Sequence, residues 1–79
     1  MAKSWDEREY RVLFETCPLS GAPPSGAKLA ALTIRLAHSR SGIAAQWDDA
    51  RMYCRGNGTV ASQGLKAYLD RAGLCRAAY

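Results

Sequence analysis

The sequence predicts a small all-α protein, with a core of three helices followed by a fourth helix. Apolar residues recur at helical spacing in four segments, and stretches rich in Gly, Pro and Ser separate these segments. Hydrophobic residues make up 48% of the 79 positions, which is enough for one small globular domain. We therefore expect a single domain, with the three-helix core over residues 4–55 and the additional helix over residues 59–73.

The first helix is expected to have Ser4 as its cap and to end before Pro18. Ser4 and Glu7 have the spacing of a capping box, in which each side chain accepts a bond from the backbone N–H of the other residue. Four apolar residues share one helical face: Tyr10, Leu13, Phe14 and Cys17. Proline cannot continue a helix in its interior, so Pro18 marks the end of the segment.

The second helix is expected after a loop at residues 18–26, with Ser25 as its cap. Its apolar face consists of Leu29, Leu32, Thr33 and Leu36. Ile34 adds an apolar side chain toward a flank of this face. The turn-like residues 38–41 then lead into the third helix.

The third helix is expected to begin after Ser39 or Ser41, either of which can cap it. Its buried stripe consists of Ile43, Trp47, Ala50 and Cys54. The run Gly56-Asn57-Gly58 then breaks the helix, because Gly and Asn tolerate positive φ.

The fourth helix is expected to begin at about Val60 or at Gln63. Its inward face consists of Leu65, Tyr68, Leu69 and Ala72. Gly73 followed by the apolar Leu74 fits a Schellman end, in which the glycine takes the left-handed conformation. The role of the tail at residues 74–79 is left open by the sequence.

The first three segments resemble the Myb/SANT type of tri-helical helix-turn-helix domain. The resemblance rests on Trp5 in the first helix, on Arg40 and Ile43 at the start of the third, and on Trp47 four residues after Ile43. The run Ser39-Arg40-Ser41 is similar to the family's Gly-Arg-Thr/Ser turn without its glycine, and aliphatic residues stand in place of the family's middle tryptophan. The resemblance implies a third helix that enters the major groove of DNA or, as in SANT-like members, binds a protein.

The outward face of the third helix is the candidate binding surface. Opposite Ile43 and Trp47 a helical projection places Ser41, Ala45, Asp48 and Met52, with Asp49 nearby. The candidate residues for binding DNA or a protein partner are Arg35, Arg40, Ser41, Ala45, Gln46, Asp48, Asp49, Arg51, Met52 and Arg55. The two tryptophans are expected to anchor the core, with base stacking as the alternative.

Three of these residues have alternative interpretations. Gln46 is a candidate reader of adenine, although its projection lies partly toward the core. Arg40 is either a solvated residue, an ion-pair partner of the first helix, or a contact to a phosphate or an acidic partner. Asp48 would oppose DNA phosphates and would suit a basic protein surface.

The charge is uneven along the chain, since residues 1–27 carry a net charge of −1 and residues 28–79 carry +5. A basic region of this kind is compatible with nucleic acid or with an acidic protein partner. We expect a small DNA-binding regulatory protein of the helix-turn-helix type that binds double-stranded DNA and forms a homodimer. The alternative is a non-catalytic protein-interaction module, for example a phage-encoded inhibitor that docks on a host or defence complex.

Neither a catalytic site nor a cofactor or metal site is expected. His38 is the only histidine, and Cys17, Cys54 and Cys75 are odd in number and far apart in sequence, so we expect three free thiols. No apolar run approaches the roughly 20 residues that span a bilayer, and the N-terminus lacks an apolar signal segment. We expect a cytoplasmic protein of a bacterial cell or of a phage-infected host, with no small-molecule substrate.

Overall fold

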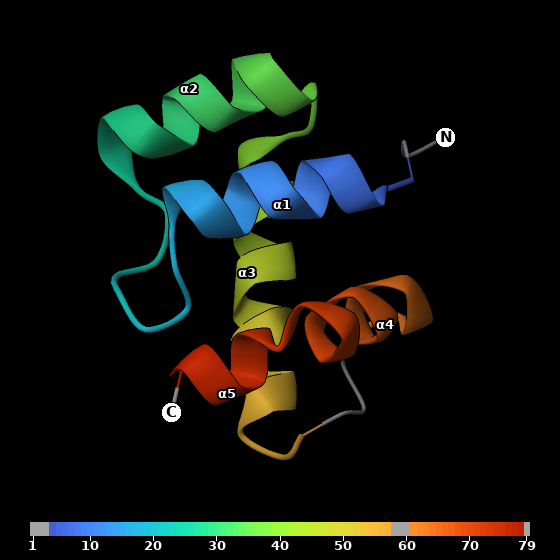
Figure 1. Ribbon diagram of the computed structural model, residues 1–79. Helices are drawn as coiled ribbons and strands as arrows, with labels where there is room; N and C mark the ends of the chain where they lie inside the picture. The colour runs from blue at the N-terminus through green and yellow to red at the C-terminus, as the bar shows by residue number, and fades with distance from the viewer. Residues whose placement is uncertain (1–3, 58–60, 79) are drawn as a thin grey trace.

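The computed structural model describes residues 4–57 and 61–78, which form helices and connecting loops and contain no strand (Figure 1). The helices are α1 (Glu7–Thr16), α2 (Gly26–Leu36), α3 (Arg40–Cys54), α4 (Gln63–Ala72) and α5 (Leu74–Ala78). The all-α prediction is confirmed. The short helix α5 was not expected, because five residues are too few to show a helical period in the sequence.

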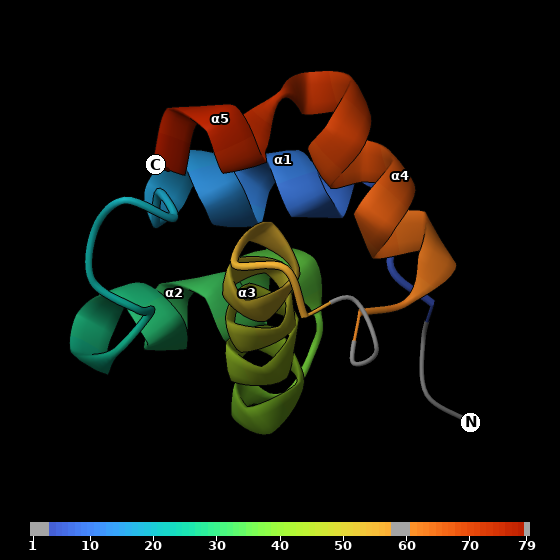
Figure 2. The same cartoon turned by 90° about the horizontal axis from the view of Figure 1, so that it is seen from below.

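The helix α3 occupies the centre of the arrangement and contacts each of the other four helices. In Figure 1 α3 crosses behind α1, and in Figure 2 it is seen nearly end-on, with α1 and α5 above it, α2 to its left and α4 to its right. Below α3 in Figure 2 lies no helix of the described part of the chain. One long side of α3 is therefore uncovered.

The core is one cluster of apolar side chains, contributed mainly by the four longer helices and also by Cys17, Leu19 and Ala61 of the connecting segments. Its largest fully buried members are Leu13, Leu32, Ile43, Trp47, Leu65 and Leu69. The predicted stripe of α3 is confirmed at three positions, while Cys54 is only partly buried. In α2, Ile34 lies outside the core with 84% exposure, because the helix turns its other face toward α3.

The start of α1 differs from the prediction. The cap is Asp6, whose carboxylate accepts a 2.9 Å bond from the Glu9 N–H, while the Glu9 side chain accepts a 3.1 Å bond from the Asp6 N–H. This capping box replaces the expected pair of Ser4 and Glu7. Both pairs have the same spacing, and Glu9 of the observed pair is 6% exposed and bonds His38.

Of the other predicted caps, that of α3 is present and that of α2 is incomplete, and α4 has a cap that was not predicted. The Ser39 hydroxyl accepts a 3.1 Å bond from the Gly42 N–H at the start of α3, and the Ser62 hydroxyl accepts a bond from the Leu65 N–H at the start of α4. Ser25 occupies the cap position of α2, but its side chain makes no capping hydrogen bond.

The helix α4 begins at Gln63, so residues 61–62 of the expected range precede it, and residues 59–60 lie outside the described residues. Leu65, Tyr68 and Leu69 are buried as expected, whereas Ala72 is exposed because the chain has reached the end of the helix and turns away. Gly73 has the predicted left-handed conformation, with φ of 66°. This turn reverses the chain toward α3 and allows α5 to form.

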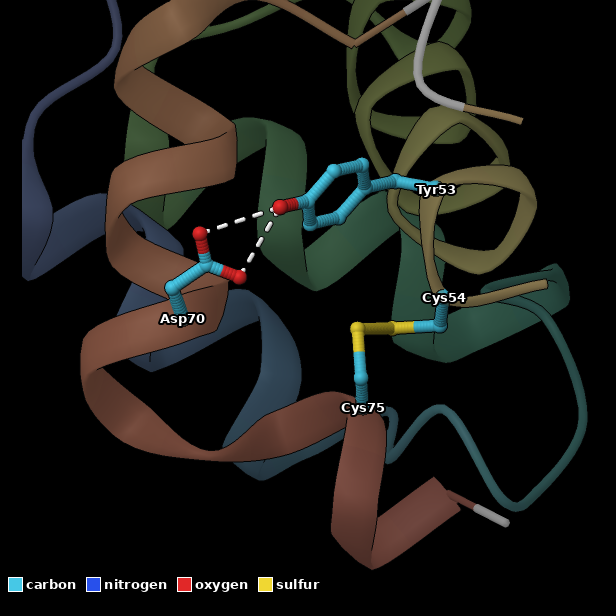
Figure 3. Close-up of a disulfide and its surroundings, with 4 residues drawn as sticks. All are labelled: Tyr53, Cys54, Asp70 and Cys75. Atoms are coloured by element: carbon cyan, nitrogen blue, oxygen red, sulfur yellow. Dashed lines mark hydrogen bonds between the residues drawn. A yellow bond between two sulfur atoms is a disulfide. The ribbon is translucent and has the colours of Figure 1, made fainter. Parts of the chain in front are cut away.

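The prediction of three free thiols is wrong, because Cys54 at the end of α3 forms a disulfide with Cys75 in α5 (Figure 3). The turn at Gly73 brings the two residues together across 21 positions of sequence. Beside the disulfide, the Tyr53 hydroxyl donates bonds of 2.9 and 3.0 Å to the Asp70 carboxylate, which raise the pKa of Tyr53. Cys17 is a free thiol, and burial raises its pKa.

Reduction of the disulfide is expected to lower the free energy of unfolding by about 3 kcal/mol, because the unfolded chain then regains the freedom of a loop of about 20 residues. Urea denaturation with and without a dithiol reductant measures this difference. The Cys75→Ser variant serves as the control, since its stability is expected to match that of the reduced protein and to be independent of the reductant. Equal stability of the oxidised and the reduced protein would contradict the expectation.

Candidate functional site

The connection between α2 and α3 is a turn of three residues, 37–39. Its first residue, Ala37, has the left-handed conformation, with φ of 57° and ψ of 38°, and its N–H bonds the Thr33 carbonyl. Its last residue, Ser39, caps α3. Turns of this length join consecutive helices both in αα-hairpins and in helix-turn-helix units.

The middle residue of this turn, His38, is fixed by α1 and by the segment before it. The Nε2 atom of His38 lies 3.0 Å from a Glu9 carboxylate oxygen, and both side chains are only 7% exposed. The Trp5 ring stacks on the imidazole, with 4.2 Å between the ring centroids. These contacts fix the start of α3 against the start of α1. The contact between Glu9 and His38 spans 29 positions of sequence, and no sequence pattern indicated it.

The uncovered side of α3 carries four exposed residues, which we call the outer face: Ser41, Ala45, Asp48 and Met52. They recur at intervals of three and four positions, so they lie in one row along the helix. Opposite them, Ile43 and Trp47 are buried. The sequence-based placement of these four residues is therefore reproduced.

Three arginines follow one edge of the outer face, and we call them the arginine flank: Arg40, Arg51 and Arg55. Arg40 is exposed at the first position of α3, and no carboxylate among the described residues forms an ion pair with it. The guanidinium of Arg51 lies over the Trp47 ring, 5.4 Å from its centroid. Arg55 is exposed just after the helix.

Two predicted site residues lie off the outer face, on the side of α3 opposite the arginine flank. Gln46 is partly buried, and its Oε1 atom is enclosed without a hydrogen-bond partner among the described residues. Asp49 is also partly buried, and this burial, together with the charge of Asp48, raises the pKa of Asp49. The outer face therefore carries one carboxylate rather than two.

Arg35 lies apart from the residues of α3. It is exposed in the last turn of α2 and lines a groove with Arg8, Arg11 and other residues of α1. The helical projection of the sequence could not exclude Arg35 from the site, because the relation between α2 and α3 depends on the turn and not on either helix alone.

An open groove of about 780 Å³ borders α3 on the side of Gln46. Its walls come from the starts of α1, α3 and α4, and they include Trp5, Tyr10, Gln46 and Ser62. The groove escaped the sequence analysis because three separate segments contribute to it. Its described lining residues include His38 but no lysine or arginine.

The described residues contain no group of three or more His, Cys, Asp and Glu side chains placed to hold a metal ion. No described helix is long and apolar enough to cross a membrane. Comparison with protein-family models, with curated proteins and with solved structures finds no match. The functional interpretation therefore rests on the geometry of α3 and its surroundings.

The Glu9→Ala substitution is expected to lower the free energy of unfolding by about 3 kcal/mol, because it removes a buried partner of His38 and half of a capping box. The matched control is Glu7→Ala in the same helical turn. Glu7 pairs with Arg71 at 3.0 Å, but both side chains are more than half exposed, so a loss of about 0.5 kcal/mol is expected. Urea denaturation measures both variants, and equal losses would contradict a special role of Glu9.

The Asp49→Asn substitution is expected to raise Tm at pH 7 and to have a smaller effect at pH 3. Because the pKa of Asp49 is raised in the folded protein, this group favours folding while it is protonated, and the contribution is lost as the pH rises through that pKa. Asn keeps the neutral form at every pH. Thermal unfolding at both pH values tests this, with Asp48→Asn as the exposed control. A larger gain at pH 3 would show that the sign is wrong.

Proposed function

We propose that this protein is a DNA-binding regulator of the helix-turn-helix type and that α3 enters the major groove. The observation that carries the proposal is the uncovered outer face of α3, on a helix that directly follows a three-residue turn. The major groove admits one α-helix, which must present a long side free of other elements. The α3 helix has 15 residues and meets this requirement.

The charge distribution on α3 supports contacts to both walls of the major groove. Arg40 and Arg55 lie 15 positions apart, which corresponds to about 22 Å along the helix axis. The major groove is about 12 Å wide, so arginines at the two ends of the helix can reach phosphates on both sides. Such contacts position a protein on DNA without reading its sequence.

The Myb/SANT-like arrangement is part of the same proposal. The three helices α1 to α3, the turn between α2 and α3, and the burial of Trp47 are consistent with it. Trp5 stacks on His38 rather than joining the fully buried core, so it supports the turn that precedes α3. In this arrangement α4 and α5 lie outside the three-helix unit and pack against α3.

A protein partner is the second candidate, and Met52 is the observation that favours it. This flexible apolar side chain is 40% exposed on the outer face, one helical turn after Asp48. An apolar residue beside a carboxylate suits a partner with a basic and apolar groove. In that case the same outer face would bind a protein, and the chain would not bind DNA.

The proposed function predicts binding to mixed-sequence duplex DNA that weakens steeply as salt is added. The Arg40→Ala/Arg55→Ala variant is expected to reduce the slope of log affinity against log salt by about 2, because each lost phosphate contact removes about one unit. Fluorescence anisotropy with a labelled duplex measures the slope. Arg51 is left unchanged because it packs on Trp47.

The control for this experiment is Arg8→Ala/Arg11→Ala, which removes the same charge from exposed positions of α1. It is expected to keep the wild-type slope. An equal loss in both variants would point to a general charge effect and against a contact made by α3. Absence of binding at low salt would exclude the DNA function and leave the protein partner as the candidate.

A further inference from the structure

We infer that Asp48 is a base-reading residue, whose carboxylate accepts a hydrogen bond from the N4 amino group of a cytosine. This inference rests on the proposed function and specifies what the outer face recognises. It gives a role to the one acidic side chain of the outer face, which a purely electrostatic account of DNA binding treats as unfavourable.

The position of Asp48 is the first argument. It lies near the middle of the outer face, with Ala45 one turn before it and Met52 one turn after it, and all three are exposed. Among the described residues, no hydrogen bond or ion pair occupies its carboxylate. A helix laid into the major groove along its outer face would therefore bring this free acceptor toward the base edges.

The charges around Asp48 are the second argument. Asp48 lines a shallow hollow of about 370 Å³ together with Arg51, Met52 and Arg55. The two arginines follow it by three and seven positions, on the same side of the helix. Their positive charge offsets the repulsion between the carboxylate and nearby phosphates. Asp48 can therefore approach the DNA in its ionised form.

The hydrogen-bonding pattern of the bases selects cytosine. A carboxylate only accepts hydrogen bonds, and in the major groove only the amino groups of cytosine and adenine donate them. Beside its amino group adenine carries the N7 acceptor, which would face the second carboxylate oxygen with like charge. Cytosine has a C–H group at the neighbouring position, so it accommodates both oxygens.

The neighbours of Asp48 make it the dominant polar reader of the outer face. Ala45 and Met52 offer only apolar contact, for which the thymine methyl group is the matching surface. Ser41 lies two turns before Asp48 and can donate or accept, so it selects weakly among the bases. The outer face therefore specifies a cytosine flanked by less strictly defined positions.

The test is selection of bound duplexes from a randomised pool by the wild type, by Asp48→Asn and by the control Asp49→Asn. We expect the wild type to enrich C·G at one fixed position, by about tenfold over the other pairs. Asp48→Asn is expected to change the preference at that position to A·T, because an amide binds the N6 and N7 atoms of adenine together. Asp49→Asn removes the same charge beside it and is expected to leave the preference unchanged.

Failure of the inference is distinguishable from failure of the proposed function. If the wild type binds DNA but selects no cytosine, or if Asp48→Asn leaves the preference unchanged, the reading role of Asp48 is overturned while DNA binding stands. An equal gain in affinity for both variants without a new base preference would show that the carboxylate acts by repulsion alone, which also overturns it. If the wild type binds no duplex in the salt titration, both the proposed function and the inference fail.

Discussion

Trp47 ties α3 to the rest of the protein, because its indole is enclosed and makes a buried hydrogen bond. The side chain is 1% exposed, and its Nε1–H donates a 2.8 Å bond to the Cys17 carbonyl at the end of α1. A buried indole N–H without a partner would cost free energy, so this bond fixes the rotation of α3 as well as its distance from α1. That rotation decides which residues of α3 face outward.

The two ends of α3 are held by different chemistry. At its start, the contact between Glu9 and His38 fastens the preceding turn to α1. At its end, the Cys54–Cys75 disulfide and the bonds from Tyr53 join it to the α4–α5 unit. A chain of 79 residues has a small core, and such fixed points compensate for limited apolar burial. The outer face is therefore carried by a rigid helix, which suits recognition by shape and position.

Features that depend on local order were predictable from the sequence, and features that depend on how helices meet were not. The helical period placed Asp48 and Met52 on the outer face, because a helix turns by about 100° per residue whatever surrounds it. The pairing of Cys54 with Cys75 needed the reversal at Gly73 and the direction of α4, which no spacing in the sequence reveals. The partial burial of Asp49 likewise comes from neighbouring helices.

The enclosure of Trp47 also gives the protein an internal optical probe. Indole emission shifts to longer wavelength when water reaches the ring, and Trp47 is sealed between the end of α1 and the Arg51 guanidinium. The other indole, Trp5, is partly exposed and stacks on an imidazole, so the two rings occupy distinct environments. A partner that docks on the outer face leaves the emission of Trp47 protected from added quenchers. A rearrangement that separates α3 from α1 exposes the indole to them.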